Sequence, residues 1–525
     1  MKKFDFILIL DFGSQYTQLI ARRTREFRVY SEIHAYALDI ENYIKTKPDL
    51  NLSGIILSGG PASVFDVNSP KLSDKNFEFI EKRKIPILGI CYGLQLLAQR
   101  YGGKIHKSII REYGDTRISK KVDSILLSNI KKELKVWMSH ADSISKMPSD
   151  FKITSKSRNG TISSFENPGI NIFALQFHPE VNHTQNGELI IENFIFKICK
   201  VKNFFKPESF INKKIAEIRK TVGKDYVICA LSGGVDSSVA TVLMKRAIGK
   251  QLICVHIDNG LMRKNESAEI IELFKNNFDI NLIFIDASET FLRKLEGVTD
   301  PERKRKIIGK TFIYIFEREA KKIKSKNGKI KYLVQGTLYP DVIESVSYKG
   351  PSATIKSHHN VGGLPAKMNL KLIEPFRELF KDEVRIIGRK LGLPKYIIGR
   401  HPFPGPGLAV RILSNITTDK LNILKDADEI FTSELKKHNL YDHIWQAFAV
   451  LLPVQTVGVM GDERSYENVI ALRAVTSKDG MTADFYSFEK EFLSIVSNKI
   501  INSIKGVNRV VYDISSKPPA TIEWE

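Results

Sequence analysis

Short, fully apolar runs that each lead into a glycine-containing turn place the strongest limit on the fold of this chain. Within residues 1–200 the runs at 4–10, 54–57 and 85–90 lead into the turns DFGSQ, SGGP and CYGLQ. Apolar runs of four to seven residues are typical of strands buried on both faces, and such strands form parallel sheets covered by helices. The pattern predicts that residues 1–200 form a doubly wound, mainly parallel α/β domain.

The same alternation begins again after a break in the pattern. Apolar runs at 226–231, 252–257, 282–285 and 332–334 are separated by helix-like stretches. Strand–helix alternation implies a second doubly wound parallel sheet, which we assign to residues 201–400.

Two proline-containing segments mark the domain boundaries. Residues 198–212 contain Pro207 and show little periodicity, so we expect a linker there. HPFPGPG at 401–407 cannot continue a helix or a central strand, and it predicts a boundary. The residues from 401 to 525 mix helical and strand-like patterns, which predicts a smaller α+β domain. Three domains fit a chain of 525 residues, since domains average roughly 150 residues.

The composition excludes several classes of protein. Apolar residues make up 42% and charged residues 26%, which is ordinary for globular proteins and unlike disordered or fibrous chains. Lys and Arg number 80 against 59 for Asp and Glu, so the formal charge is +21. This excess is spread along the chain rather than gathered into a stripe, so we expect no nucleic-acid partner.

Cysteine usage and hydropathy point to the cytoplasm. Cys91, Cys199, Cys229 and Cys254 lie far apart without a CxxC pair, which fits a reducing compartment better than a disulfide framework or a zinc module. The amino-terminal apolar run is short and bracketed by acidic residues, unlike a signal peptide. No run approaches the length of a membrane span, so we expect no membrane partner.

Cys91 is the candidate nucleophile. It follows an apolar run and precedes a helix-like stretch, between Gly89 and Gly93. This G-x-C-x-G pattern is the thiol counterpart of the strand–turn–helix nucleophile elbow, whose small residues allow a sharp turn. A helix N-terminus at that point favours the reactive thiolate. The alternative for Cys91 is an inert buried cysteine.

A candidate base and an oxyanion hole lie in the same predicted domain. FALQFHPE predicts a strand ending at His178, and Glu180 points to the same side two residues later, so its carboxylate can orient the imidazole. The alternative for His178 is a purely structural histidine at the end of a strand. The backbone amides of Tyr92 and of the turn containing Gly60 are candidates for the oxyanion hole. Together these residue types suggest acyl transfer through a thioester.

The four segments DFGSQY, SGGP, GICYGLQ and FHPE resemble, in order and spacing, the signature segments of class I glutamine amidotransferase domains. The resemblance implies that Cys91 attacks a glutamine amide, that His178 and Glu180 activate it, and that ammonia is released. Such domains serve many synthases, so the domain leaves the acceptor open.

SGGVDSS at 232–238, between an apolar run and a helical stretch, is the second chemical centre. Two glycines and three hydroxyl side chains at a helix N-terminus form an anion cradle, without the lysine of G-x-x-x-x-G-K-[ST] loops. The string resembles the pyrophosphate loop of N-type ATP pyrophosphatases, which implies that ATP is a co-substrate. The ATP-binding candidates are Ser232, Gly233, Gly234, Val235, Asp236, Ser237 and Ser238. Asp236 is also the candidate ligand of phosphate-bound Mg²⁺, or it caps the helix.

Strings later in the chain extend the resemblance to its full length. DPERKRKIIG, HPFPGPGLAVR, VGVMGDERSY and KPPATIEWE resemble those of a family of ATP- and glutamine-dependent ligases that aminate xanthosine 5′-monophosphate (XMP). The resemblance implies that Arg305, Lys517 and Glu523 bind XMP and that the C-terminal domain dimerises. Arg305 paired with a neighbouring acid and Lys517 in a plain tail are the alternatives. Arg28 departs from the family pattern, where glycine often follows the first helix.

Several alternatives remain open at this point. His358 and His359 are adjacent and have no third ligand at suitable spacing, so a mobile lid at 356–365 is the better interpretation than a metal site. A tRNA-thiolating enzyme shares the loop but needs catalytic cysteines, whereas Cys229 and Cys254 fall inside apolar runs. A basic nucleic-acid-binding protein on a dead synthase fold is the remaining alternative, and intact catalytic residues argue against it.

Overall fold

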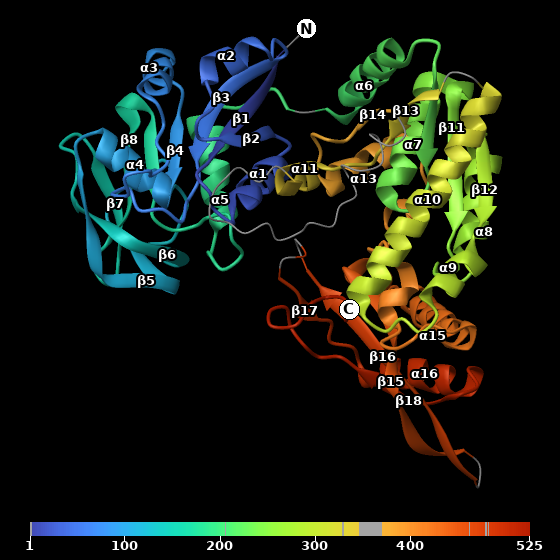
Figure 1. Ribbon diagram of the computed structural model, residues 1–525. Coiled ribbons are helices and arrows are strands. Elements are labelled where there is room, and N and C mark those ends of the chain that lie inside the picture. Colours follow the sequence, from blue (N-terminus) through green and yellow to red (C-terminus); the bar gives the residue numbers. More distant parts are fainter. Residues whose placement is uncertain are drawn as a thin grey trace. The chain divides into compact units, whose positions relative to one another are not determined.

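The computed structural model describes residues 3–204, 206–327, 330–345, 370–460, 463–477, 480 and 482–525. The described chain forms two compact units (Figure 1). The first contains residues up to 210 together with helix α11 (Tyr339–Ser345), and the second contains the described residues of 211–338 and 360–525. The histidine-containing segment 356–365 lies outside the described residues.

The first unit is built on a nine-stranded sheet, drawn in blue to teal in Figure 1. In spatial order its strands are β2 (Tyr30–Ala35), β1 (Phe4–Asp11), β3 (Leu50–Leu57), β4 (Ile87–Ile90), β9 (Ile172–Leu175), β8 (Ile162–Asn167), β7 (Lys152–Ser157), β5 (Lys104–Lys120) and β6 (Glu133–Lys146). The first five are parallel, and the remaining four continue the sheet by antiparallel pairing. The predicted doubly wound sheet is confirmed, and the antiparallel extension adds to it.

Continuous apolar runs explain why the parallel strands are buried on both faces. The residues Phe6 to Leu10 of β1 and Ile55 to Leu57 of β3 are fully buried, because helices or other strands cover both faces. Besides α11, the described α-helices of this unit are α1 (Thr17–Glu26), α2 (Ile40–Lys45), α3 (Asp74–Arg83), α4 (Tyr92–Arg100) and α5 (Gly187–Glu192). β1 and β4 end at the loops that carry the predicted amidotransferase segments.

Arg28 keeps the turn geometry for which glycine is the usual residue. It follows the C-cap of α1 with φ +60°, in the left-handed region, and its amide donates to the carbonyl of Arg25. A left-handed residue at this place is the usual way to end a helix, and a side chain makes it more costly than glycine does. The turn is therefore retained in spite of the arginine.

The second unit begins with a five-stranded parallel sheet. Its strand order is β12 (Leu282–Asp286), β11 (Leu252–Asp258), β10 (Tyr226–Ala230), β13 (Ile330–Val334) and β14 (Lys371–Ile373). The chain moves from β10 toward β12 in one direction and then from β13 to β14 in the other. The carboxyl ends of β10 and β13 therefore form the topological switch point, where open α/β sheets bind ligands.

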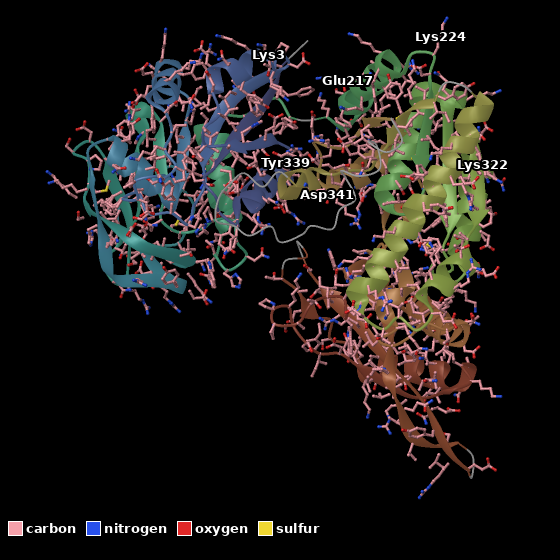
Figure 2. The ribbon with its side chains drawn as sticks, viewed as in Figure 1. Lys3, Glu217, Lys224, Lys322, Tyr339 and Asp341 are labelled. Atoms are coloured by element: carbon pink, nitrogen blue, oxygen red, sulfur yellow. The ribbon has the colours of Figure 1, made fainter. Side chains whose placement is uncertain are left out.

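Helices of the second unit cover this sheet and the C-terminal one. They are α6 (Pro207–Val222), α7 (Val235–Ile248), α8 (Glu266–Glu272), α9 (Ser288–Leu295), α10 (Pro301–Asn327), α13 (Lys381–Lys390), α14 (Lys395–Ile398), α15 (Thr418–Lys437) and α16 (Lys490–Ser503). The long helix α10 packs on β10, β11 and β13 and is yellow in Figure 1. The side chain of Lys322 in this helix is 62% exposed and projects outward in Figure 2.

The C-terminal residues form a third sheet inside the second unit. β15 (Gln446–Met460) and β16 (Glu463–Thr476) make a long antiparallel hairpin, β17 (Asp484–Phe485) pairs with β16, and β18 (Val507–Tyr512) pairs with β16 in parallel. This arrangement with α15 and α16 confirms the predicted α+β class. One hydrophobic core joins β10 and β11 to α15 and β16, so the core continues across the predicted boundary at residue 401.

Within the described residues, the helices include none whose length and apolar content would let it cross a membrane.

Candidate functional site

Cys91 lies on a sharp elbow between β4 and α4. Its φ of +53° and ψ of −101° are unusual for a residue with a side chain. A Cβ atom on Gly89 would lie 2.6 Å from the carbonyl oxygen of Gly93, and one on Gly93 would lie 2.5 Å from the carbonyl oxygen of Leu57. Both glycines are therefore required by close backbone packing, which explains the G-x-C-x-G pattern.

His178 and Glu180 form a buried pair beside this elbow. Nδ1 of His178 lies 2.7 Å from Oε1 of Glu180, and the two side chains are 3% and 0% exposed. Burial disfavours the imidazolium, but the Glu180 carboxylate and the contact with Cys91 outweigh it, so the pKa of His178 is raised well above its ordinary value. The strand β9 ends at Leu175, three residues earlier than the sequence suggested, so a turn rather than an extended strand aligns the pair.

Contacts from other elements fix the base in place, and sequence reasoning had assigned them no role. The ring of Tyr16 meets the imidazole of His178 edge-on, with 5.0 Å between ring centroids. Nε of Arg23, on α1, donates to the carbonyl oxygen of Glu180 at 3.1 Å. Thr184 Oγ1 donates to the carbonyl oxygen of His178 at 2.6 Å. Tyr16 belongs to the DFGSQY segment, and this is the sequence signal from which its role could have been inferred.

Two groups contact the thiol of Cys91 besides His178. Sγ lies 3.5 Å from the carbonyl oxygen of Ser139, on β6, and 3.7 Å from Nε2 of Gln176. Gln176 is fully buried, and its Oε1 has no hydrogen-bond partner among the described residues. The thiol thus faces a hydrogen-bond acceptor on one side and an amide donor on another. No sequence pattern in β6 indicated the contact between Ser139 and Cys91.

The turn that contains Gly59 and Gly60 lies beside Cys91 and His178. A Cβ atom on Gly59 would lie 3.1 Å from Cε1 of His178 and 3.5 Å from Cβ of Cys91, so this turn touches both residues. At Gly60 a Cβ atom would lie 2.6 Å from the carbonyl oxygen of Phe12, so the turn has no room for a side chain. Tyr92 is the first residue of α4, where backbone amides have no partner within the helix.

The loop from 231 to 234 joins β10 to α7 at the switch point of the second sheet. Gly233 has φ +81°, and a Cβ atom there would lie 2.1 Å from Cδ1 of Ile270. Ser232 Oγ contacts Ser237 Oγ at 2.9 Å, and Ser237 Oγ donates to the carbonyl oxygen of Gly234 at 3.0 Å. The structure brings the predicted loop residues together around the N-terminus of α7.

Cationic side chains from distant segments surround this loop, and sequence reasoning missed them. Arg400 donates from Nη1 to the carbonyl oxygen of Gly233 at 3.2 Å and forms an ion pair of 2.5 Å with Glu266. Lys381 Nζ lies 3.8 Å from Oδ2 of Asp236, which stands in the first turn of α7. These cations follow the loop by well over a hundred residues, so no local spacing indicated them.

The three predicted substrate residues all lie in the second unit, with partners of their own. Arg305 Nη2 donates to the carbonyl oxygen of Glu525 at 2.6 Å, and its Nε is 3.7 Å from Glu302. Lys517 Nζ donates to the carbonyl oxygen of Gly480 at 2.8 Å. Glu523 accepts two hydrogen bonds from Arg411, of 3.1 and 2.9 Å. The C-terminal tail is thereby held against the domain.

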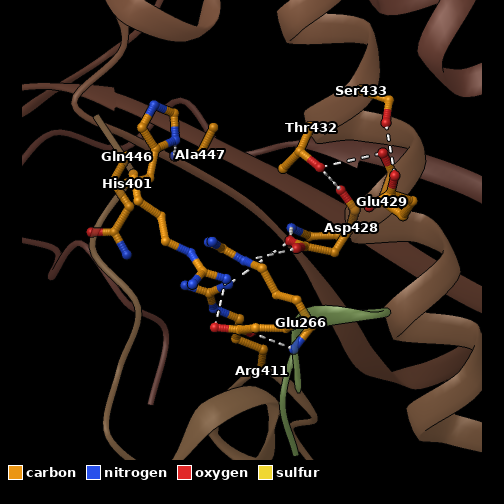
Figure 3. Close-up of polar contacts among 12 residues, drawn as sticks. Glu266, His401, Arg411, Asp428, Glu429, Thr432, Ser433, Gln446 and Ala447 are labelled. Atoms are coloured by element: carbon orange, nitrogen blue, oxygen red, sulfur yellow. Dashed lines mark hydrogen bonds and ion pairs between the residues drawn. The ribbon is translucent and has the colours of Figure 1, made fainter. Parts of the chain in front are cut away.

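Two residues of the HPFPGPGLAVR string, His401 and Arg411, take part in buried polar contacts near the residues labelled in Figure 3. Arg411 is fully buried, and its Nη1 is 3.8 Å from Oδ1 of Asp428. His401 accepts from the amide of Ala447 at 3.2 Å, and its Nε2 faces the carbonyl oxygen of Tyr441 at 2.9 Å. Burial is the main reason that the pKa of His401 is lowered to about 4.

Three family models match successive parts of the chain. Residues 8–198 match the model of class I glutamine amidotransferases, residues 206–337 match that of NAD synthase, and residues 433–524 match the GMP synthase C-terminal domain. The chain is 56% identical over 521 residues to the glutamine-hydrolysing GMP synthase of Brachyspira hyodysenteriae. Identity to those of Pelodictyon phaeoclathratiforme and Cytophaga hutchinsonii is 54% over 527 and 53% over 522 residues. Each alignment covers 99% of both proteins.

A thiol elbow with its buried base, joined in one chain to a lysine-free phosphate loop, defines a glutamine-dependent ligase that uses ATP. Three family models and full-length relatives narrow this class to one member. The chain belongs to the family of glutamine-hydrolysing GMP synthases.

Proposed function

We propose that this chain converts XMP to GMP in two linked reactions, with Cys91 releasing ammonia from glutamine and the loop at 232–238 binding ATP. The observation that carries the proposal is the buried contact among Cys91, His178 and Glu180 on a nucleophile elbow. The reaction is the ATP-dependent formation of a carbon–nitrogen bond, which serves guanine nucleotide synthesis.

Glutamine hydrolysis follows from the groups around the thiol. Sγ of Cys91 attacks the side-chain amide carbon of glutamine, and His178 takes the thiol proton and donates it to the departing ammonia. Glu180 holds the imidazole and stabilises its charged form. The amides of Gly60 and Tyr92 stabilise the oxyanion of the tetrahedral intermediate. Water then hydrolyses the thioester to glutamate.

Adenylation activates the acceptor for ammonia. The O2 atom of XMP attacks the α-phosphorus of ATP, and pyrophosphate leaves into the cradle formed by Ser232, Gly233 and the start of α7. The N-terminus of α7 favours bound anions because of the helix dipole. Arg400 and Lys381 add positive charge around the loop. Ammonia then adds at C2 and AMP departs, which leaves GMP.

Asp236 is the protein group that fits a Mg²⁺ ion delivered with ATP. Its carboxylate stands at the N-terminus of α7, beside the residues that would hold the phosphates. Mg²⁺ is commonly bound through one or two carboxylates together with substrate phosphate oxygens. When bound, the ion neutralises charge on the pyrophosphate. Among the described residues no group of three or more His, Cys, Asp or Glu side chains forms a metal site.

Arg305, Lys517 and Glu523 are the proposed contacts of XMP. Arg305 is 37% exposed, so its guanidinium can reach a 5′-phosphate while it holds the tail through Glu525. The carboxylate of Glu523 is fixed by Arg411 and by Gln446, whose Nε2 donates at 2.5 Å. A carboxylate held in one orientation suits recognition of ribose or base donors. This proposal assigns nucleotide binding to residues 401–525 together with α10.

We also propose a homodimer formed through the C-terminal domain. The hairpin of β15 and β16 carries exposed apolar side chains, with Val457 58%, Val459 75% and Tyr466 65% exposed. Val457 and Val459 share one face, because side chains alternate along a strand. Replacing both valines by Asp should convert a dimer to a monomer in light scattering. A monomeric unaltered protein would contradict the dimer.

We assign three domains to the chain and place the protein in the cytoplasm. Residues 1–200 form the amidotransferase, 201–400 the adenylating domain and 401–525 the dimerisation and substrate-binding domain. The four cysteines are all free thiols, which suits a reducing cytoplasm.

The decisive experiment separates the two reactions. Purified protein is given XMP, Mg-ATP and either glutamine or ammonium, and GMP, AMP and ADP are resolved over time. We expect GMP and AMP in equal amounts from both nitrogen sources, and Cys91→Ala should remove only the glutamine-dependent reaction. The control variant is Cys199→Ser, at another buried cysteine. Formation of ADP in place of AMP, or glutamine use by Cys91→Ala, would contradict the proposal.

A further inference from the structure

A second buried histidine–carboxylate pair lies in the first unit, apart from the pair that supports Cys91. Nε2 of His140, on β6, is 3.1 Å from Oε2 of Glu112, on β5, and the two side chains are 1% and 2% exposed. Asn159 donates to the other oxygen of Glu112 at 2.9 Å. Neither residue takes part in the proposed hydrolysis of glutamine. Burying such a pair is costly unless all its polar groups form hydrogen bonds.

The hydrogen bonds of the pair hold both side chains in one orientation. Nδ1 of His140 faces the carbonyl oxygen of Asp142 at 3.1 Å, and Nε2 faces a carboxylate, so both ring nitrogens meet acceptors. Burial raises the pKa of Glu112, but hydrogen bonds from His140, Ser157 and Asn159 outweigh that effect and lower it overall. The carboxylate therefore stays charged opposite the ring.

The pair stands where the register of two strands is set. The β5–β6 ladder is irregular between Lys107 and Glu112, and beyond this irregularity the first directly opposed residues are Glu112 and His140. A slip of one residue in a strand turns every side chain to the opposite face. A hydrogen-bonded pair that is buried at the first opposed position makes such a slip costly, because both buried polar groups would lose their partners.

The stretch of β6 that carries His140 is also the stretch that meets the nucleophile. Ser139, the preceding residue, presents its carbonyl oxygen to Sγ of Cys91 at 3.5 Å. The carbonyl oxygen of Asp142 accepts from Gln95 Nε2, on the helix that follows the elbow, at 3.1 Å. Ser63 Oγ, just after the SGGP turn, donates to Oδ2 of Asp142 at 2.5 Å. Shifting β6 would therefore disturb the thiol, the elbow helix and the turn together.

We propose that His140 and Glu112 are positioning residues for glutamine hydrolysis, which lock β6 in register so that the carbonyl of Ser139 and the backbone of Asp142 complete the thiol site. This inference rests on the proposed role of Cys91. The pair acts through the backbone of β6 and is not a second catalytic dyad, because within the described part of the chain the contact with Cys91 comes from Ser139 of that strand.

Replacing either partner tests the inference. Glu112→Gln and His140→Gln keep the approximate size of each side chain but remove the contact between carboxylate and imidazole, and we expect each to lower kcat for glutamine by about 10²-fold, since misplacement of about 1 Å costs that much. KM for glutamine should change less than kcat. Because ammonium bypasses this site, the rate of GMP formation from ammonium should stay unchanged in the full chain. The double variant should lose no more than the worse single variant, since the two residues act as a unit.

Glu166→Gln is the matched control. Glu166 is another buried carboxylate of the first unit, on β8, and it accepts from Ser124 Oγ at 2.6 Å. Glu166→Gln should leave glutamine-dependent kcat unchanged. An equal loss in Glu166→Gln would assign the effect to general destabilisation and overturn the inference. Unaltered kcat in Glu112→Gln or His140→Gln, or losses that multiply in the double variant, would overturn it as well.

Asn159→Ala covers the case in which Glu112→Gln and His140→Gln fail to fold and lose the ammonium reaction too. It removes one donor to Glu112 from an exposed turn, and we expect a smaller, severalfold loss of glutamine-dependent kcat with the ammonium rate intact. No loss in Asn159→Ala would count against the inference. Cys91→Ala is run beside it: if that variant still hydrolyses glutamine, the proposed function has failed rather than the role of the pair.

Discussion

Oε1 of Glu180 lies 2.7 Å from Nδ1 of His178, and neither side chain has appreciable contact with solvent. Oε2 of the same carboxylate has no hydrogen-bond partner among the described residues. Glu180 therefore directs its single strong side-chain contact at the imidazole, and the base depends on it for orientation and for charge stabilisation.

Replacing Glu180 by Gln should impair glutamine hydrolysis alone. Gln cannot stabilise the imidazolium, and in related triads the loss of the acidic partner costs about 10⁴ in kcat. We expect a fall of between about 10² and 10⁴ in glutamine-dependent GMP formation, and no change with ammonium. Glu188→Gln is the control, because the side chain of Glu188 is 59% exposed and pairs with Arg23. A loss below about tenfold in Glu180→Gln would contradict this role.

Gly93→Ala should disrupt the elbow. The added Cβ would lie 2.5 Å from the carbonyl oxygen of Leu57, and backbone atoms cannot yield as a flexible side chain does. We expect glutamine-dependent kcat to fall by at least about tenfold while ammonium still supports GMP formation. Gly169→Ala meets only the side chain of Asn167, at 3.2 Å, and should behave as the unaltered enzyme. Steady-state rates of GMP formation with glutamine and with ammonium test this prediction.

Gly233→Ala should weaken ATP binding. Both a φ of +81° and the contact of 2.1 Å with Ile270 oppose a side chain in this loop. Gly249, at the other end of α7, also has positive φ, at +56°, but faces open space. Gly249→Ala should therefore share a backbone strain of about 1–3 kcal/mol without the effect on ATP. We expect KM for ATP to rise only in Gly233→Ala, and an equal rise in both variants would point to general strain instead.

His401 should make the protein less stable in acid. Its pKa is lowered from 6.5 to about 4 in the folded protein, mainly by burial. The unfolded chain binds the proton first as the pH falls, so stability that is fully present above pH 6.5 is lost progressively toward pH 4. The loss amounts to roughly 3 kcal/mol.

Thermal unfolding midpoints at pH 7 and pH 5 measure this effect. His401→Gln should be less stable at pH 7 and should show a smaller decrease between the two pH values than the unaltered protein. His443→Gln is the matched control, since His443 lies nearby and is exposed. An identical decrease in the unaltered protein and in His401→Gln would show that other groups control the acid lability.

Local sequence patterns determined the sheets and the chemical segments of this protein. Apolar runs with glycine turns indicated buried parallel strands because a strand buried on both faces needs an uninterrupted apolar stretch. The elbow at Cys91 and the loop at Gly233 were recognisable because a few adjacent residues must satisfy a narrow backbone geometry. The pairing of His178 with Glu180 was equally local, although β9 ends before it.

Only the tertiary structure decided which distant groups complete each site. The carbonyl of Ser139, the amide of Gln176 and the guanidinium of Arg400 reach the thiol or the phosphate loop from other elements. Pairing of β5 with β6 across an irregular register brought Glu112 opposite His140. A polar residue in a strand looks the same in sequence whether it meets solvent or a partner. Which of the two it meets depends on strand order and register, and contacts between residues far apart in the chain fix both.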